Sequence, residues 1–412
     1  MKIQEEDMKQ QVIVVGGGAS GLTAAIVAAR SGASVAIIEH TSKPGKKLLS
    51  TGNGKCNLTN MNQFDEAYRS NYPEFINKAR KQVTVEETLH FFRDLGLVLT
   101  DRNGYIYPYS GQATAVLEAL LAELKYLGVE IITDCRVTQI QPDLTVITSA
   151  GKRKADAVIL AAGSMAASKT GSDGSGYTLA KALGHRIIPP LPALVQLKCK
   201  ETWYKQVTGV RTEAIVTLKV DGKVTASDRG ELQLTDYGVS GIPVFQVSRF
   251  AVKGLKENKP VIIELDLIPA MDYKETMEYL TERRNRFGHR PAKEFLNGVI
   301  NQKLIPILLK EAGIHSGNVA QLTQAQIKAL TDALKGLKTV VTSFNSYEQA
   351  QVCSGGIDTR EANPETMEST LVKGLYLAGE VLDVDGICGG YNLQWAWTSG
   401  ILAGRHAGRG LR

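Results

Sequence analysis

The stretch Val12–Glu39, VIVVGGGASGLTAAIVAARSGASVAIIE, decides the fold of this chain. Its first four residues form a continuous β-branched run, which is typical of a strand buried on both faces. A helix of small residues follows the glycines, and a second apolar run ends on Glu39. The stretch therefore predicts a complete βαβ unit.

The turn between the first strand and the helix contains Gly16, Gly18 and Gly21 in the order G-x-G-x-x-G. Gly16 permits the tight turn, Gly18 lets a pyrophosphate approach the backbone, and Gly21 lets helix and strand pack closely. The helix N-terminus offers N–H groups to phosphates, and Glu39 can accept hydrogen bonds from a ribose. A glycine-rich turn in an ordinary α/β fold is the alternative. The complete unit favours dinucleotide binding over it.

The composition is that of an ordinary globular protein. The 412 residues suggest two or three domains, with 22% charged and 6% aromatic residues. The formal charge of +6 is spread along the chain without a Lys/Arg block. Such a mild excess can favour anionic ligands, but it argues against nucleic acid as a main partner.

The five cysteines and the apolar runs indicate the compartment. None of the cysteines forms a C-x-x-C pair, which argues against a zinc site or a redox dithiol. A scattered, odd set suits a reducing cytoplasm. The polar N-terminus MKIQEEDMKQQ is no signal peptide, and no apolar run has the length of a bilayer span. We therefore expect a soluble cytoplasmic protein without a membrane partner.

A long polar connection, HTSKPGKKLLSTGNGKCNLTNMN, follows Glu39. Unpatterned segments of this length are usually functional or disordered. Lys46, Lys47, Lys55 and the backbone N–H groups could meet phosphates or an electron-rich ring. We interpret the segment as a loop that covers a ligand, with a solvated basic loop as the alternative.

Short strands and helices continue the nucleotide-binding pattern up to about residue 190. The last of these strands, Ala155–Leu160, runs into Ala161-Ala162-Gly163, a turn that lets the backbone pass close to a ligand. A second glycine cluster at Gly171, Gly174 and Gly176 has the order G-x-x-G-x-G. We interpret it as a loop and helix start rather than a second nucleotide site.

An antiparallel insert is predicted after Pro189. Its β segments include Lys223–Ala226, Glu231–Leu234 and Val244–Ser248, and Asp221-Gly222 is a hairpin signal. The stretch 238–241, GVSG, resembles part of a nucleophile elbow, but residue 242 is Ile where that motif needs glycine, which argues against a serine hydrolase.

The pattern turns helical from Asp272 to about Leu337, with Asp272 as a predicted N-cap and a capping box at Thr323 and Gln326. A basic run there is more typical of a solvated face than of an anion site; it comprises Arg283, Arg284, Arg286, His289 and Arg290.

The C-terminal region returns to the glycine-rich style of the beginning. Leu375–Ala378 reads as a strand, and Gly389-Gly390 opens a helix. The sequence thus predicts an α/β protein with a Rossmann-like domain split in sequence (1–190 and 345–412). An antiparallel, barrel-like β insert on the substrate side (191–270 and 338–344) and a nested helical subdomain (271–337) complete it.

Five motifs now carry a resemblance to a known family. They are GGGASG (16–21), STGNGKCNLTN (50–60), YPYS (107–110), CSGGID (353–358) and LYLAGEVLDVDGICGGYNLQWAWTSG (375–400). The chain resembles the flavoproteins with two dinucleotide-binding domains, and more narrowly the aminoacetone-oxidase-like FAD-binding family, essentially from end to end. Two positions depart from the family pattern: Asp236 stands where histidine is frequent, and Cys353 where a threonine-like residue is expected.

The resemblance implies FAD as the cofactor, with a set of binding residues in this chain. It implies the pyrophosphate at the first glycine motif, the ribose at Glu39, the adenine by Val137 and the flavin ring near Gly390–Asn392. The full set is Gly16, Gly18, Ala19, Ser20, Gly21, Glu39, His40, Lys47, Gly52, Asn53, Gly54, Cys56, Asn57, Val137, Ala161, Ala162, Gly163, Gly379, Glu380, Asp385, Gly390, Tyr391, Asn392 and Leu393.

The expected activity is hydride transfer between a small organic molecule and the flavin. The family name implies an amine or amino-ketone oxidase, and an NAD(P)H-dependent reductase of a steroid-like enone is the alternative, with NAD(P)H as a transient donor. An FAD-dependent tRNA-modifying protein and a non-catalytic flavin binder remain open. Cys56 has no partner cysteine in its motif, so packing or hydrogen bonding is favoured over a redox role. Neither a catalytic residue nor the oligomeric state follows from the sequence.

Overall fold

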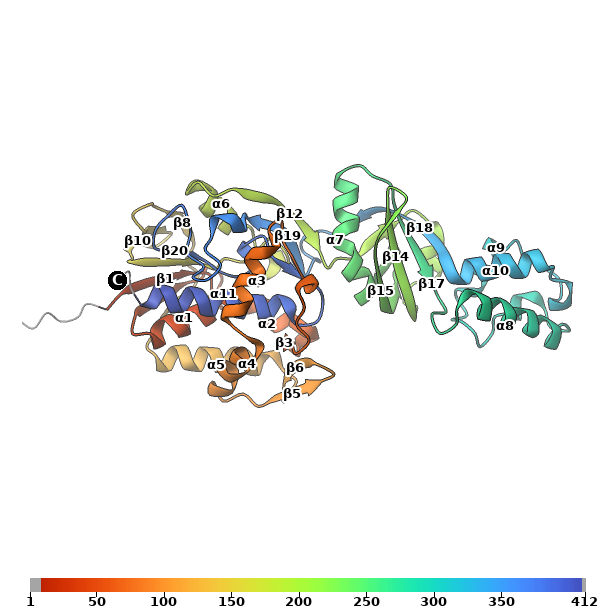
Figure 1. The fold of residues 1–412 in the computed structure, drawn as a ribbon, viewed down its shortest axis with the longest axis horizontal. Coiled ribbons are helices and arrows are strands. Elements are labelled where there is room, and N and C mark those ends of the chain that lie inside the picture. Colours follow the sequence, from red (N-terminus) through yellow and green to blue (C-terminus); the bar gives the residue numbers. More distant parts are fainter. Residues whose placement is uncertain (1–8, 410–412) are drawn as a thin grey trace, which may run out of the picture. The chain divides into compact units, whose positions relative to one another are not determined.

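The computed structural model describes residues 9–409, which form two compact units. One unit contains the described residues up to Leu191 and from Gln351 onward, and the other comprises Pro192–Ala350. The two ends of the sequence, red and blue in Figure 1, therefore meet in the first unit.

A five-stranded sheet, parallel in every pairing, forms the centre of the first unit. Its order is β20-β11-β1-β2-β7, and β1 pairs with β2 from Gln11↔Ser34 to Val15↔Ile38. The continuous apolar runs place the inner strands between two covered faces, and all four residues of β11 are buried. The strands are β1 (Gln11–Val15), β2 (Ser34–Ile38), β7 (Glu130–Ile132), β11 (Ala157–Leu160) and β20 (Leu375–Leu377).

The first and last helices of the described chain pack side by side against this sheet (Figure 1). They are α1 (Ala19–Arg30) and α11 (Tyr391–Gly408). Glycines of α11 face the backbone of α1: a Cβ added at Gly400 would lie 2.6 Å from the carbonyl oxygen of Ser20, and one at Gly404 would lie 2.5 Å from that of Ala24. The small-residue pattern thus lets the two helices pack closely in the same direction, with the start of α11 lying beyond the start of α1.

The remaining elements of the first unit surround this core. Its other helices are α2 (Lys46–Ser50), α3 (Pro73–Gln82), α4 (Val85–Asp94), α5 (Ala113–Tyr126) and α6 (Ser175–Ala182). Its smaller sheets combine β8 (Val137–Ile140), β9 (Thr145–Thr148) and β10 (Gly151–Lys154); β3 (Thr59–Asn60), β5 (Leu99–Arg102) and β6 (Tyr105–Pro108); β4 (Tyr68–Arg69) with β21 (Asp385–Gly386); and β12 (Ile187–Ala193) with β19 (Val352–Ile357).

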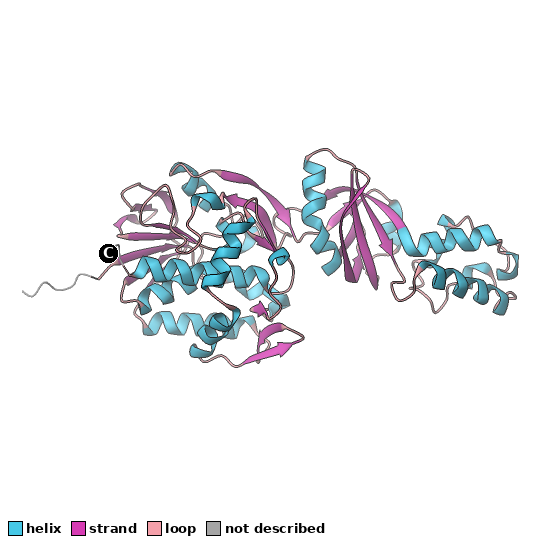
Figure 2. Cartoon of the chain, viewed as in Figure 1, coloured by secondary structure: helices cyan, strands magenta, loops and turns pink. Residues whose placement is uncertain are grey.

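The second unit is built on a closed antiparallel barrel, magenta in Figure 2, of the order β13-β16-β15-β14-β17-β18. Closure removes the exposed strand edges that an open sheet would present. Its strands are β13 (Leu197–Cys199), β14 (Arg211–Val220), β15 (Lys223–Leu234), β16 (Gly238–Gly241), β17 (Val261–Asp266) and β18 (Leu337–Phe344). The predicted α/β class, with a Rossmann-like part and a barrel-like insert, is therefore confirmed.

Two details of the insert differ from the sequence-based expectation. Val244–Ser248, predicted as a β segment, lies in helix α7 (Ile242–Lys256). Pro243 occupies the first turn of α7, where a missing N–H costs nothing, and Val244, Val247 and Val252 are buried on one side. A window of five residues is too short to distinguish the helical repeat of 3.6 residues from the strand repeat of two. The β segments at 223–226 and 231–234 form one continuous strand, β15.

A helical segment is inserted between β17 and β18. It comprises α8 (Tyr273–Arg286), α9 (Ile305–Glu311) and α10 (Gln324–Gly336). Capping boxes open α8 at Asp272 and α10 at Thr323. In the basic run, Arg283 donates to the carbonyl oxygens of Phe295 (2.5 Å) and Asn297 (2.6 Å). Arg283 therefore links α8 by hydrogen bonds to the segment that contains Phe295 and Asn297.

Among residues 9–409, we find no helix with both the length and the apolar character that crossing a bilayer requires. The expected cytoplasmic location stays a prediction.

Candidate cofactor-binding site

The three glycines of the first turn serve different purposes. At Gly16, with φ +106°, an added Cβ would lie 2.5 Å from the carbonyl oxygen of Ala161, and at Gly21 it would lie 2.0 Å from that of Gly16. At Gly18 it would meet no described atom within 4 Å, and the backbone there is extended, with φ −81°. Packing explains Gly16 and Gly21. The open space at Gly18, in front of Ala19 and Ser20 in the first turn of α1, fits a ligand phosphate.

Glu39 is buried directly beside this turn. Its Oε2 accepts a hydrogen bond from the Gly17 N–H (2.8 Å), and its Oε1 accepts one from the Thr41 N–H (2.7 Å). Each carboxylate oxygen keeps a further acceptor lone pair. The backbone therefore fixes the side chain while leaving it able to accept bonds from a ribose.

His40 and the start of β8 meet through Asp173. Nε2 of His40 lies 3.9 Å from the Asp173 carboxylate, which Arg136, the neighbour of Val137, binds at 2.8 Å. Burial raises the pKa of Asp173, but hydrogen bonds from Ser175 and Arg136 outweigh it and lower this pKa to about 2. The contacts of Asp173 with His40 and Arg136 therefore bring His40 close to Val137, the residue expected beside the adenine.

The expected pyrophosphate region continues through Gly379 and Glu380. A Cβ at Gly379 would lie 2.3 Å from the Ser20 hydroxyl, so the two segments touch. The Glu380 carboxylate binds Lys47 Nζ at 2.6 Å and accepts a hydrogen bond from the Ser164 hydroxyl at 2.8 Å. Sequence reasoning missed Ser164, although it directly follows the turn Ala161-Ala162-Gly163, and only the long-range contact reveals it.

The segment after Lys47 adopts a left-handed backbone at three successive residues. Gly52, Asn53 and Gly54 have φ of +55°, +58° and +80°. A Cβ at Gly52 would lie 3.7 Å from Cε1 of Tyr107. Burial raises the pKa of the Cys56 thiol to about 12. A thiol this buried and protonated is inert, which favours the packing role expected for it.

Gly389–Asn392, the C-terminal junction, leads into α11 and packs directly against the backbone of β3. Gly390 has φ +97°, and a Cβ there would lie 2.7–2.9 Å from the backbone of Thr59. With its amide rotated, Asn57 accepts a hydrogen bond from the Gly390 N–H (3.3 Å) and donates to the Thr59 oxygen (3.0 Å). Asn392 accepts from the Gly386 N–H at 2.8 Å, and Tyr391 donates to the Asn62 oxygen at 2.8 Å.

Three further positions singled out in the sequence, Leu393, Asp385 and Cys353, are half-buried or buried in the first unit. Leu393 is half-buried and packs against the hydrophobic core at the start of α11. Asp385 is buried in β21, opposite Arg69 of β4, and its role at a cofactor stays a prediction. Cys353 is buried in β19, and burial raises its pKa to about 11.

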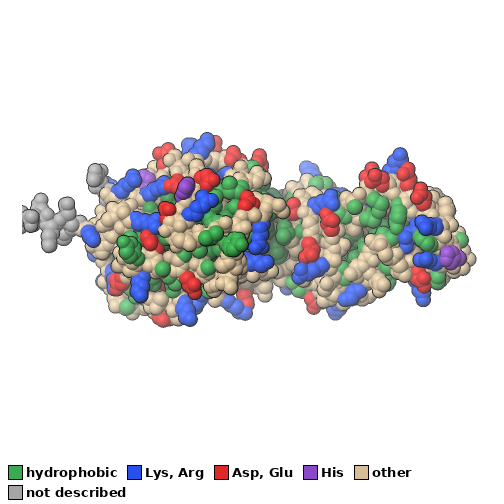
Figure 3. All heavy atoms as spheres, turned by 90° about the horizontal axis from the view of Figure 1, so that it is seen from below, with side chains coloured by type: hydrophobic (Ala, Val, Ile, Leu, Met, Phe, Trp, Pro, Cys, Tyr) green, Lys and Arg blue, Asp and Glu red, His purple; other side chains and the backbone are tan. Residues whose placement is uncertain are grey.

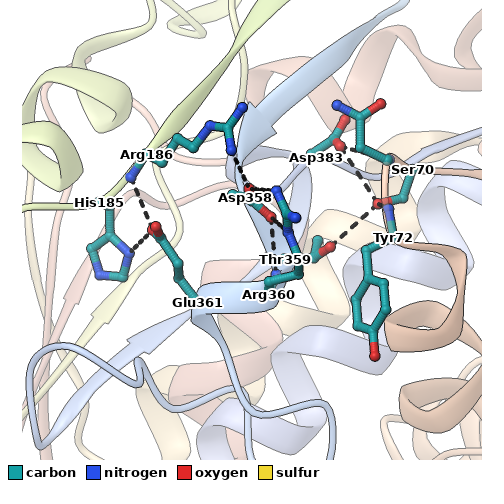
Figure 4. A network of polar contacts seen from close by, with 10 residues as sticks. Ser70, Tyr72, His185, Arg186, Asp358, Thr359, Arg360, Glu361 and Asp383 are labelled. Atoms are coloured by element: carbon teal, nitrogen blue, oxygen red, sulfur yellow. Dashed lines mark hydrogen bonds and ion pairs between the residues drawn. The ribbon is translucent and has the colours of Figure 1, made fainter.

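His185 faces Glu361 in a polar network of the first unit (Figure 4). His185 Nδ1 lies 3.0 Å from Glu361 Oε2, and its Nε2 lies 3.0 Å from the Ser369 hydroxyl. This order of Ser, His and Glu is that of a hydrolase triad. However, the His185 side chain is fully buried and Ser369 Oγ accepts the N–H groups of the following turn, so the group is structural.

A continuous series of contacts links the expected parts of the site. It leads from Gly16–Gly21 to Gly379–Glu380, then to Lys47 and Gly52–Gly54, and finally through β6 to Gly389–Asn392. Such a path suits an extended dinucleotide with the phosphates at one helix N-terminus and the far end at another. The open space at Gly18 and the largely buried Lys47–Glu380 pair are the features that fit a bound group.

The comparisons with known proteins agree with this architecture. The family model described as the HI0933-like protein Rossmann domain matches residues 10–406. A 3-dehydro-bile acid delta(4,6)-reductase of Clostridium scindens is 46% identical over 395 residues, 94% of this chain and 97% of the relative. A ribosomal RNA dihydrouridine synthase of Haemophilus influenzae is 28% identical over 391 residues, 92% of this chain and 94% of the relative.

Among solved structures, a 3-ketosteroid-delta4-(5alpha)-dehydrogenase from Rhodococcus jostii RHA1 aligns with a TM-score of 0.48 and 16% identity. The alignment covers 99% of this chain and 98% of that one. The expected oxidoreductase and flavoprotein class is confirmed, whereas the aminoacetone-oxidase-like subtype is not. The chain belongs to the HI0933-like Rossmann-domain family.

Proposed function

We propose that this protein is an FAD-dependent reductase that saturates a carbon–carbon double bond conjugated to a ketone in a steroid-like small molecule. The observation that carries the proposal is the 46% identity, over nearly the whole of both chains, to a reductase whose name describes such an enone. In that name, "3-dehydro" denotes the ketone, and "delta(4,6)" the double bonds conjugated with it. This was the alternative among the activities expected from the sequence.

The proposed cofactor contacts follow the series of contacts described above. The N–H groups at the start of α1 would hold the pyrophosphate over Gly18, with Glu39 on the ribose and His40 and Val137 toward the adenine. Lys47 and Glu380 would face the central part of FAD. Bound FAD supplies the redox chemistry, by accepting and donating hydride equivalents. The N-terminus of α11 would favour negative charge at the far end.

The proposed reductase and an amine oxidase would differ in the source of the electrons that reduce the flavin. NAD(P)H is the proposed donor, binding transiently, since the second glycine cluster lacks the G-x-G-x-x-G order. An amine or amino-ketone oxidase rests on the sequence resemblance alone. It predicts reduction by an amine and reoxidation by oxygen.

The test is an anaerobic spectroscopic titration of the FAD-loaded protein. NADH, NADPH and a panel of small amines are added separately, and the oxidised flavin absorbance is followed. The reduced protein is then mixed with 4-androstene-3,17-dione, and the product is identified by mass spectrometry. Bleaching by NAD(P)H and recovery with the enone support the proposal. Bleaching by an amine with recovery only in air would overturn it in favour of an oxidase.

A second candidate is reduction of a uracil base in ribosomal RNA. The relatives named as ribosomal RNA dihydrouridine synthases, 28% identical over most of this chain, favour it, because dihydrouridine also results from saturation of a double bond next to a carbonyl. Acidic and basic side chains are interspersed on the face drawn in Figure 3, so this face offers RNA no continuous basic surface. Incubating the reduced protein with unmodified ribosomal RNA and measuring dihydrouridine separates the two candidates.

A further inference from the structure

Three phenols gather where β6 meets the C-terminal junction. A Cβ at Gly389 would lie 2.8 Å from Cε1 of Tyr105 and 3.6 Å from Cε2 of Tyr391. Tyr107 stands two residues from Tyr105 and therefore on the same face of β6, with Ile106 buried on the other. This face reaches both Gly52 and Gly389, which lie in the two segments expected beside the flavin ring.

The three phenols differ in what engages them. Tyr391 is buried, and its hydroxyl donates to the carbonyl oxygen of Asn62. The ring of Tyr107 lies under the Arg102 guanidinium, 5.5 Å from the ring centroid, and burial raises its pKa. Tyr105 is 41% exposed, and its hydroxyl has no hydrogen-bond partner within residues 9–409. Of the three phenols, Tyr105 is the most exposed, and it can therefore meet a substrate and exchange protons with water.

Other acidic groups around this junction are already engaged. The Glu380 carboxylate is held by Lys47 and Ser164, and Asp101 accepts the Gly104 N–H at 2.6 Å. The Cys56 thiol is fully buried. Saturation of an enone consumes one hydride and one proton, so the site needs a proton donor beside the double bond.

We propose that Tyr105 is the catalytic acid of the enone reduction, an inference that rests on the proposed function. Bound reduced FAD would supply the hydride for the new C–H bond at the β-carbon. The electron pair of the double bond shifts toward the carbonyl, and the α-carbon takes the phenolic proton of Tyr105, which leaves a single C–C bond. The exposed phenolate then regains a proton from water, so charge and atoms balance.

The test separates proton transfer from cofactor binding and from flavin reduction. In Tyr105→Phe, the ring that contacts Gly389 remains, so FAD affinity, the reduction rate with NAD(P)H, and the affinity of the oxidised protein for 4-androstene-3,17-dione should change less than about 3-fold. Reoxidation of the reduced protein by the enone should slow at least about 100-fold, as general acids typically contribute that much. The matched control, Tyr109→Phe, alters a phenol that is 73% exposed at the end of the same hairpin and should behave as wild type.

The outcomes distinguish this inference from the proposed function. If the wild type is not reoxidised by the enone, the proposed function fails. If the wild type reacts and Tyr105→Phe reacts at the same rate, only the role of Tyr105 is refuted. A weaker affinity for FAD in Tyr105→Phe would make the residue part of the cofactor site and would also refute its role as the acid. In deuterated water, the wild-type reoxidation should show a solvent isotope effect of at least about 2, and its absence would contradict the proposal independently of any variant.

Discussion

The two glycine-rich junctions of the first unit look alike in sequence and differ in structure. One, Gly16–Gly21, follows strand β1 of the parallel sheet and opens α1, whereas the other, Gly389–Asn392, follows β21 and opens α11. A Cβ at Gly18 would meet no described atom within 4 Å, whereas a Cβ at Gly390 would lie 2.7 Å from the Thr59 backbone. Glycine thus leaves room for a ligand at Gly18, whereas at Gly390 it allows the backbone of another segment to approach closely.

The largest expected effect is on folding, at the C-terminal junction. Gly390→Ala would combine a close backbone contact with a left-handed φ of +97°, and should lower the free energy of unfolding by about 2–4 kcal/mol. Denaturant unfolding of the cofactor-free protein measures this. Gly18→Ala is the matched control and should cost at most about 1 kcal/mol, as a change at an N-cap. Equal losses in both variants would contradict the difference between the junctions.

The next effect is on the cofactor, at the N-terminal junction. Gly18→Val fills the open space, and the loss of one charge-assisted hydrogen bond to phosphate corresponds to about 10–100-fold weaker FAD binding. Fluorescence titration of the cofactor-free protein with FAD measures it, with Gly18→Ala as the intermediate variant. The unfolding midpoint without FAD should stay near that of Gly18→Ala. FAD affinity equal to wild type would refute the assignment of this space to the pyrophosphate.

A smaller effect is expected at Glu39. Glu39→Gln keeps the shape of the side chain, but its NH2 group replaces one of the two oxygens that accept the Gly17 and Thr41 N–H groups, and the change should weaken FAD binding about 10-fold. The control is Glu130→Gln, in the neighbouring strand β7, where the carboxylate pairs with Arg153 at the surface. The same titration decides: if both variants bind FAD equally well, Glu39 does not contact the ribose.

The smallest effect at neutral pH concerns the buried Cys56. Its folded pKa of about 12 lies above the ordinary 9.0, so its contribution to stability is complete below pH 9 and is lost as the pH rises toward 12. Each pH unit in that window removes about 1.4 kcal/mol. Cys56→Ala should therefore lose stability less steeply than wild type between pH 9 and 11, as measured by denaturant unfolding. Identical slopes would show that this thiol does not resist ionisation.

The sequence was sufficient where the information is local. The βαβ unit of Val12–Glu39 and the capping boxes at Asp272 and Thr323 depend on neighbouring residues, and the structure contains them. Val244–Ser248 was predicted as a strand because the pattern of five residues fits a helix and a strand equally well. Only the full burial pattern of α7 shows its helical face.

The parts of the site that the sequence did not reveal depend on distant contacts. Ser164 binds Glu380 across 216 positions of sequence, and Tyr105 meets Gly389 across an even larger separation. The sequence also gave no means to distinguish Gly18 from Gly390, because a glycine that faces open space and one that faces backbone have the same letter. The family resemblance implied a cofactor role for both glycines, and the space around each Cα distinguishes them.

The most direct measurement is a crystal structure of the protein grown with FAD. We predict the pyrophosphate in the open space at Gly18, within hydrogen-bonding distance of the first N–H groups of α1. Glu39 should contact the adenosine ribose, and the flavin ring should lie next to the β6 face that bears Tyr105. A pyrophosphate bound elsewhere, or a flavin ring remote from Gly389–Asn392, would contradict the central claim that the two junctions hold opposite ends of one cofactor.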